Sequence, residues 1–235
     1  MANPPITIGE LIDVPAPGSP IASAWPQEIT HRSVHRFATS AARDAAWTNR
    51  GAGALAWTAD YGRLCMWDGG GWLILRESAT TVAAGSGNNA VWPHSTGASS
   101  TIIGQTATWA VATTVQAQYI RYAGLCHIVV QFKLGASGFG IGQLNLPFVA
   151  GSMQPIDQEL TVTHIQASSG VYWAGWSQAL SNQRIALMSQ FVSGTSVSRQ
   201  STSATVPFTW TTGDMVGIVG TYTLSNPYDQ FYMNP

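Results

Sequence analysis

Apolar residues occupy every second position from Cys126 to Leu134, which is the clearest strand pattern in the chain. In an extended backbone, alternate side chains point to opposite faces, so this stretch has one wholly apolar face. Ala123-Gly124 is typical of a turn or bulge, and it separates this strand from a preceding one at Gln118 to Tyr122. We expect this pair to be central to a β-sheet domain.

Similar short runs, separated by Gly, Pro, Ser and Asn, continue through the second half of the chain. The further predicted strands are Thr108 to Thr113, Gln143 to Leu146, Glu159 to Gln166, Val171 to Trp176, Arg184 to Ser189, Ser203 to Trp210 and Met215 to Leu224. This spacing favours a two-sheet antiparallel sandwich, jelly-roll-like, over residues 108–235. The predicted fold class is therefore mainly β.

The first 35 residues have a different pattern. Residues 4–18 contain four prolines among alternating apolar residues, which predicts an extended arm. From about Pro20 to Val34, Ile21, Trp25 and Ile29 recur every four residues, which predicts a short amphipathic helix. This apolar stripe either forms a homotrimeric helical seam or packs against its own domain.

Residues 36–77 predict a small helix followed by a three-stranded meander. A helix is expected over Thr39 to Trp47, capped by Thr39 or Ser40. Strands are expected at Ala54 to Ala59, Arg63 to Trp67 and Trp72 to Leu75, joined by Gly-containing turns.

The charge distribution supports a boundary near Glu77. Residues 1–77 carry six Arg and seven Asp or Glu, whereas the remaining 158 residues carry four basic and four acidic residues. Residues 78–107 are small and polar without periodicity, so we expect a linker there. The predicted divisions are thus 1–35, 36–77, 78–107 and 108–235.

Charged residues make up 9% of the chain, against about 25% in an average soluble domain. The formal net charge is −1, so no basic field is present to bind phosphate backbones, and we expect no nucleic acid partner. Low net charge does little to keep chains apart and suits a protein inside an assembly.

The chain shows no signal peptide pattern and no window of membrane-spanning length, so we expect no cleaved export signal and no membrane insertion. Its two cysteines, Cys65 and Cys126, fall in different predicted parts of the chain. We expect buried free thiols, with a disulfide as the alternative.

The chain contains no convincing catalytic, cofactor or metal constellation. His31 and His35 share a predicted helix with no third ligand nearby, and we interpret them as a solvated helix face. His127 and His164 alternate with apolar residues and are interpreted as hydrogen-bonded sheet residues. Asp157 and Glu159 are a weak candidate for a glycosidase pair, because nothing near them would assemble a sugar cleft. We expect no enzyme and no cofactor.

Ten tryptophans require an explanation. Five of them, Trp25, Trp47, Trp57, Trp67 and Trp72, crowd the N-terminal part, where we expect a cluster that lies partly at a subunit contact. Together with Ile21 and Ile29, Trp25, Trp67 and Trp72 are the candidate attachment residues.

Tyr172, Trp173 and Trp176 are candidate receptor contacts, because exposed aromatic rings can stack on a sugar or a partner protein. The alternative, which we favour, is that Trp173 or Trp176 fills the core.

Two stretches resemble structural proteins of tailed bacteriophages. Arg43-Asp-Ala-Ala46, Gly53-Ala-Leu-Ala56, Tyr61-Gly-Arg-Leu64 and Trp67-Asp-Gly-Gly-Gly-Trp72 are similar to a helix-plus-meander module common in those proteins. Tyr119-Ile-Arg-Tyr-Ala-Gly124, Gly135 to Gly142, Leu144 to Phe148 and Pro207 to Tyr222 resemble a phage tail-associated β-sandwich over residues 115–223. The tail from Ser225 to Pro235 is longer than in that family.

The resemblance implies a non-enzymatic virion protein of the minor tail, tail fibre or head spike type. Residues 1–77 would dock to other virion proteins, and the C-terminal domain would project as a homotrimeric knob that takes part in host adhesion. A capsid-attached head fibre or decoration protein is the alternative. From other classes, a module that binds a host-surface glycan or protein, or a cell-wall hydrolase, also stays open.

Overall fold

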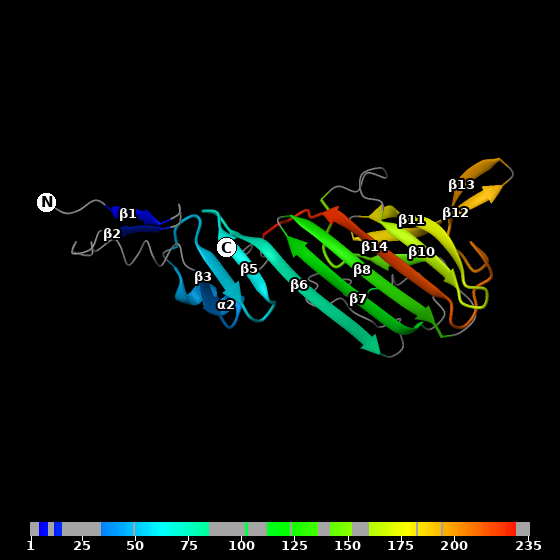
Figure 1. The fold of residues 1–235 in the computed structure, drawn as a ribbon, viewed down its shortest axis with the longest axis horizontal. Helices are drawn as coiled ribbons and strands as arrows, with labels where there is room; N and C mark the ends of the chain where they lie inside the picture. The colour runs from blue at the N-terminus through cyan, green and yellow to red at the C-terminus, as the bar shows by residue number, and fades with distance from the viewer. Residues whose placement is uncertain are drawn as a thin grey trace. The chain divides into compact units, whose positions relative to one another are not determined.

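The computed structural model describes residues 5–8, 12–15, 34–48, 50–84, 102, 112–122, 124–135, 142–151, 160–181, 183–193 and 195–228 (Figure 1). The chain forms two compact units. The first comprises residues 1–77 and 228–235, and the second comprises residues 78–227. The prediction that everything from residue 108 to residue 235 belongs to one domain was therefore wrong at its end, because the chain returns to the first unit at Tyr228.

The first unit is built from short strands and one helix. Strands β1 (Pro5–Ile8) and β2 (Ile12–Pro15) pair antiparallel, so the predicted extended arm pairs with itself. Strands β3 (Val34–Phe37), β4 (Leu55–Thr58), β5 (Arg63–Trp67) and β6 (Trp72–Ala84) lie in the order β6-β5-β4-β3. The predicted helix and meander over residues 36–77 are present, but strand β3 was not anticipated.

Strand β3 pairs parallel with β4, with Val34 opposite Leu55 and Phe37 opposite Thr58. A parallel pair needs a crossover connection, which helix α2 (Ser40–Ala46) supplies. Thr39 caps this helix, because its Oγ1 accepts from the amide of Ala42 at 3.0 Å. Strand β3 corrects two predictions: the division between residues 35 and 36 falls inside a strand, and His35 lies in β3 rather than on a helix.

The second unit is an antiparallel sheet (Figure 1). Its strands are β7 (Ala112–Tyr122), β8 (Leu125–Leu134), β9 (Gln143–Asn145), β10 (Thr161–Gln166), β11 (Val171–Ser181), β12 (Arg184–Ser193), β13 (Ser196–Ser201) and β14 (Met215–Thr223). Seven of them follow one hydrogen-bonded order, β13-β12-β11-β10-β14-β8-β7, and β9 pairs with β12. The prediction of a mainly β fold is confirmed, and the two-sheet sandwich stays a prediction.

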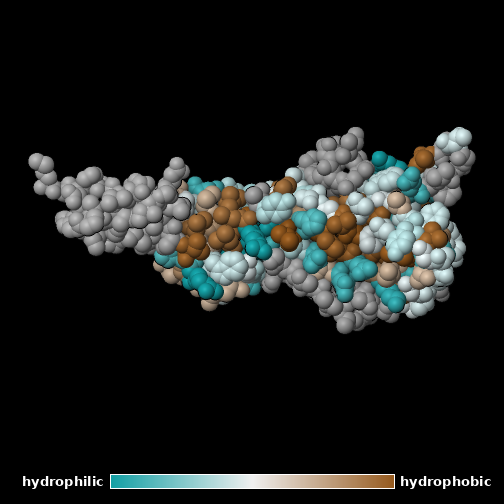
Figure 2. All heavy atoms as spheres, viewed as in Figure 1, coloured by the Kyte–Doolittle hydropathy of each residue, from teal (hydrophilic) through white to brown (hydrophobic). Residues whose placement is uncertain are grey.

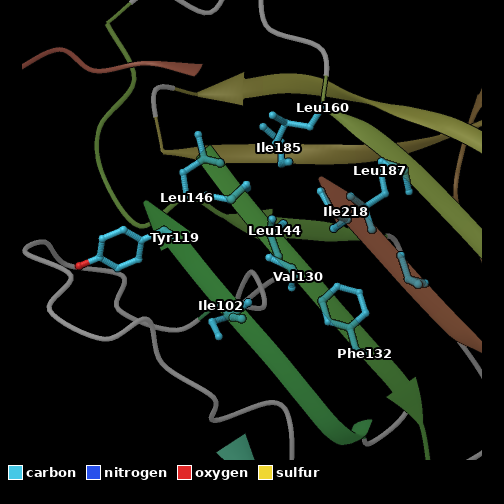
Figure 3. Packing of buried hydrophobic residues seen from close by; sticks show 14 of the residues in the cluster. Ile102, Tyr119, Val130, Phe132, Leu144, Leu146, Leu160, Ile185, Leu187 and Ile218 are labelled. Carbon is cyan, nitrogen blue, oxygen red and sulfur yellow. The ribbon is translucent and has the colours of Figure 1, made fainter. Parts of the chain in front are cut away.

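The core of the second unit lies on one face of this sheet, which we call the inner face. The residues predicted to form the apolar face of the strongest strand, from Cys126 to Leu134, are all buried there. Figure 3 shows Val130 and Phe132 of β8 pointing toward Leu144 of β9 and Ile218 of β14, with Ile185 and Leu187 of β12 nearby. Strands far apart in the order therefore bury their side chains in one cluster.

Three predictions about the second unit were wrong in detail. Residues 78–84, predicted as linker, continue β6, and Ile102 from the same stretch is buried in the core. Residues 203–210, predicted as a strand, belong to a long excursion between β13 and β14 that we call the 202–214 excursion. Strand β13 was missed. The predicted helix lies outside the described residues except for Val34, which begins β3.

No helix in the described part of the chain has the length and apolar character needed to cross a lipid bilayer.

Candidate interaction surface

The face of the second unit's sheet opposite the core, which we call the outer face, is open to solvent over several strands. Cross-strand partners define it: Gln118 lies opposite Val129, which lies opposite Val219, which lies opposite Thr161. Thr161 in turn lies opposite Trp176. Because paired residues of antiparallel strands point to the same side, this row runs across five strands on one face.

Apolar side chains on the outer face remain exposed in this subunit. Ile120, Tyr122 and Val219 are 42%, 42% and 41% exposed, and Leu125 and Val129 between them are partly exposed. Figure 2 shows hydrophobic residues gathered over β8 and β14, surrounded by more polar ones. An antiparallel sheet face that is fully solvated normally carries polar residues, so we take these side chains as the candidate contact surface.

The outer face carries few charges. Lys133, Arg184 and Arg199 lie on it, and the described residues of 78–227 include a single carboxylate, Asp214, which is buried. A shallow depression of about 110 Å³ is lined by Gln116, Gln131, Lys133 and Met215. Within it the Gln131 amide donates to the Met215 sulfur at 3.9 Å. Amides, hydroxyls and aliphatic groups therefore dominate the surface.

The candidate receptor residues separate onto two faces. Tyr172 and Trp176 belong to the outer face, where Tyr172 is 70% exposed and the Arg199 guanidinium lies 4.7 Å from the Trp176 ring centroid. Trp173 points to the inner face and packs on the core, with its ring 6.3 Å from that of Phe208. The preferred interpretation, that one of the two tryptophans fills the core, therefore holds for Trp173.

The tryptophan cluster predicted for the first unit is present at Trp47, Trp67 and Trp72. The Trp72 ring centroid lies 5.8 Å from that of Trp47 and 5.5 Å from that of Trp67. The guanidinium of Arg43 lies 4.5 Å from the Trp72 ring, and that of Arg50 lies 3.9 Å from the Trp67 ring. These cation-π contacts let two arginines pack inside an aromatic core.

Trp72 has no exposed surface and Trp67 is only partly exposed. The prediction that Trp72 lies at a subunit contact was therefore wrong, because its own subunit buries it fully. The other candidate attachment residues, Ile21, Trp25 and Ile29, lie outside the described residues.

In the described part of the chain, no three His, Cys, Asp or Glu side chains form a possible metal-ligand group. His127 Nδ1 hydrogen-bonds Thr221 Oγ1 at 3.0 Å, and His164 Nε2 hydrogen-bonds Thr202 Oγ1 at 3.0 Å. Both are therefore sheet residues with hydrogen bonds, as predicted. His35 was misplaced on a helix face, since in β3 its ring lies 4.5 Å from that of Trp47.

Sequence reasoning missed a buried polar cluster on the inner face. Ser189 Oγ lies 3.0 Å from Thr202 Oγ1 and 3.5 Å from His164 Nε2, and none of the three residues has exposed surface. A serine near a histidine is the start of a nucleophilic site, but no substrate can reach a hydroxyl that is fully buried. A signal was present, since His164 interrupts an apolar strand pattern with a polar group that requires partners.

No protein-family model matches this chain, and neither the curated proteins nor the solved structures give a match.

Proposed function

We propose that the protein is a non-enzymatic structural component of a tailed-phage virion, whose second unit associates with two identical copies through the outer face of its sheet. The first 77 residues then serve for docking to other virion proteins. The trimeric state and the virion location in this proposal rest on the sequence resemblance. The exposed apolar side chains of the outer face are the observation that carries the association.

The chemistry of the outer face suits burial against another chain. Burial against another chain would remove apolar surface of Ile120, Tyr122 and Val219 from water, and this removal lowers the free energy of the complex. The neighbouring Gln and Thr side chains can exchange hydrogen bonds with water for hydrogen bonds with a partner. Few charges would have to be desolvated, since Lys133, Arg184 and Arg199 are the charged side chains that the strand register places on this face.

Light scattering of the purified chain tests the association. The expected mass is three times the 25.0 kDa of one chain. Val219→Lys would bury an unpaired charge and should shift the population to single chains, whereas Val34→Lys in the first unit, where Val34 is 50% exposed, should not. A mass of one chain at every concentration contradicts the proposal.

A second candidate function, adhesion to the host surface, is favoured by the exposure of Tyr172. Its ring is the most exposed large apolar side chain among the described residues. Tyr172 lies in the row of Ile165, Met215 and Lys133, away from the contact residues, since Ile120 lies opposite His127 on β8. Binding of the purified protein to host cell envelopes tests this function. Tyr172→Ala should weaken binding by about tenfold or more without changing the mass in solution, whereas Leu180→Ala on the same strand should leave binding intact. Equal binding by both variants contradicts the adhesion function.

A further inference from the structure

Four aromatic rings hold the 202–214 excursion against the inner face of the sheet. The excursion supplies Phe208 and Trp210, whose ring centroids lie 4.4 Å apart. The sheet supplies His164, 5.6 Å from Trp210, and Trp173, 6.3 Å from Phe208. His164 and Trp173 are themselves cross-strand partners. The excursion therefore covers the sheet through a closed group of rings in which His164 is the titratable member.

His164 also anchors the residue at which the excursion begins. Its Nε2 hydrogen-bonds Thr202 Oγ1 at 3.0 Å, and Ser189 Oγ joins both groups. Backbone hydrogen bonds hold the same residue. The Thr202 amide donates to the Leu187 carbonyl at 2.9 Å, and the Thr202 carbonyl accepts from the Gly142 amide at 3.3 Å. Loss of the imidazole contact would therefore loosen the first residue of the excursion.

The other nitrogen of His164, Nδ1, is buried and makes no hydrogen bond of good geometry with a described residue, although the Trp173 backbone acts on the ring as a hydrogen-bond partner. The imidazole Cε1 lies 3.0 Å from the position that a Cβ on Gly175 would occupy. None of the described residues packed against the ring carries a charge; they are Trp173 and Gly175 of β11, Ser189 of β12, Val216 of β14, and Thr202 and Trp210 of the excursion.

Asp214, the one carboxylate among the described residues of 78–227, is already engaged. Asp214, at the far end of the excursion, accepts from the amide of Ala167 at 2.8 Å and from the amide of Thr211 at 2.6 Å. It also accepts from the Thr211 hydroxyl at 3.1 Å. Asp214 therefore fixes the end of the excursion next to β14.

A proton added to His164 would create a charge and a second N–H donor in this apolar site. Burial lowers the pKa of His164 to about 4, and the neighbouring Trp173 backbone offsets part of that shift. The folded pKa is below the ordinary value of 6.5, so the anchored state is fully stable above pH 6.5 and loses stability as the pH falls toward 4.

We propose that His164 is an acid-sensitive latch, which holds the 202–214 excursion on the sheet at neutral pH and releases it when the imidazole takes up a proton. Release exposes the indole of Trp210 and the phenyl ring of Phe208, which are buried in the latched state, and uncovers more of the partly buried Trp173. The fold thereby contains an apolar surface that becomes available in an acidic compartment or medium.

Hydrogen exchange of the full chain tests the latch. Amide exchange is measured at pH 7.5 and pH 5.0 and corrected for the intrinsic effect of pH on the exchange rate. The opening constant reported by the Thr202 and Gly142 amides should rise about 30-fold at pH 5.0. The amides that pair β8 with β14 should keep their protection. Equal loss of protection in β8 and β14 would mean that the whole unit unfolds, which overturns the latch.

Two substitutions of the same type separate the latch from other acid effects. His164→Gln keeps a hydrogen-bonding side chain but cannot gain a proton, so the Thr202 and Gly142 amides should respond less than about twofold to the same change of pH. His127→Gln, on the outer face of β8, should retain the 30-fold response. A His164→Gln chain that opens at acidic pH as the unsubstituted protein does contradicts the proposal.

A third variant covers the case in which His164→Gln does not fold. Thr202→Val removes the hydroxyl that hydrogen-bonds His164 Nε2. The anchored state therefore loses stability, and opening should begin at a higher pH. An unchanged pH of opening in Thr202→Val would show that Thr202 is not part of the latch and overturns it.

Discussion

Arg63 and Glu77 form an ion pair inside the first unit, with 2.7 Å between Arg63 Nε and Glu77 Oε2 and exposed side-chain fractions of 3% and 0%. The pair joins the first residue of β5 to the last residue of the unit before the chain enters the second. The Arg63 guanidinium also lies 4.0 Å from the Tyr61 ring. A change at either end of the pair therefore affects a buried charge.

Glu77→Gln removes the carboxylate charge with which the buried Arg63 guanidinium pairs at 2.7 Å. We expect the unfolding free energy of the first unit to fall by about 3 kcal/mol. Urea denaturation followed by the amide signals of β4 and β5 measures it. The double substitution Arg63→Met/Glu77→Leu removes both charges and should recover most of this loss. A cost below about 1 kcal/mol for Glu77→Gln alone would contradict the prediction.

Gly175→Ala should destabilise the second unit by about 2 to 3 kcal/mol. A Cβ at Gly175 would collide with the carbonyl oxygen of Met188 on the neighbouring strand, so β11 and β12 would have to separate. Gly217→Ala is the matched control, because a Cβ there meets no atom within 4 Å. Thermal or urea unfolding of both variants makes the comparison. Equal stability of the two would show that β11 and β12 adjust without cost.

Tyr228→Phe should raise the pKa of Asp68. The Asp68 carboxylate accepts from the amides of Gly70 and Gly71 and from the Tyr228 hydroxyl, which donates to Oδ2 at 2.7 Å. The Gly70 amide contributes most to the lowered pKa of Asp68, and the Tyr228 hydroxyl contributes next. The substitution should therefore move the pKa part of the way back toward 3.8.

A carboxyl-carbon NMR titration of Asp68 measures this shift. Because the folded pKa is lowered, the contact stabilises the fold above pH 3.8 and is lost as the pH falls through the folded value. Tyr172→Phe, on the exposed outer face of the second unit, is the control and should leave the Asp68 titration as it was. An unchanged Asp68 pKa in Tyr228→Phe would show that the Tyr228 hydroxyl does not affect the carboxylate.

The two thiols should be unreactive in the folded protein. Cys65 and Cys126 are free and fully buried in the cores of the first and second units. A thiol reagent can reach them only after local or global opening, so the native reaction should be slower than the denatured one by about three orders of magnitude. Ellman's reagent should titrate two thiols per chain in denaturant. Fast reaction of one thiol in native buffer would place that cysteine at an exposed site.

The strands that the sequence predicts best are those with one polar and one apolar face. Strand β8 (Leu125–Leu134) covers the predicted alternation from Cys126 to Leu134, and Gly124 provides the expected turn with a positive φ of 83°. Helix α2 and strands β4 and β5 were equally clear, since Thr39 supplies a cap and Gly residues punctuate the turns. Local sequence signals are sufficient to predict these elements.

The sequence predicted poorly wherever distant contacts decide the structure. Strand β3 pairs in parallel with β4, which begins eighteen residues after the end of β3 at Phe37. No local sequence pattern predicts such a distant pairing. The converse error occurred at Val206, Phe208 and Trp210. Their alternating apolar pattern is typical of a strand, although they belong to the 202–214 excursion. Their aromatic side chains are buried by packing on His164 and Trp173 rather than by a sheet pleat.

The candidate contact residues illustrate the same limit. Trp173 and Trp176 are three residues apart, so a single strand places them on opposite faces, and only the sheet decides which face is covered. The exposed group on the outer face was not predicted, because Ile120, Val129 and Val219 come from three strands that become neighbours only in the fold. The Trp-rich segment likewise gave no sign that Arg43 of α2 and Trp47 would pack on Trp72.

The antiparallel bridge between Leu73 and Tyr228 has an implication for how this protein can be changed. The polypeptide departs from the first unit along β6 and comes back beside the same strand, so residues 78–227 are topologically an insert with both attachment points at one place. Such an arrangement permits cassette exchange. A foreign domain with neighbouring ends could replace the insert while the host fold, including the Tyr228 and Asp68 contact, is kept.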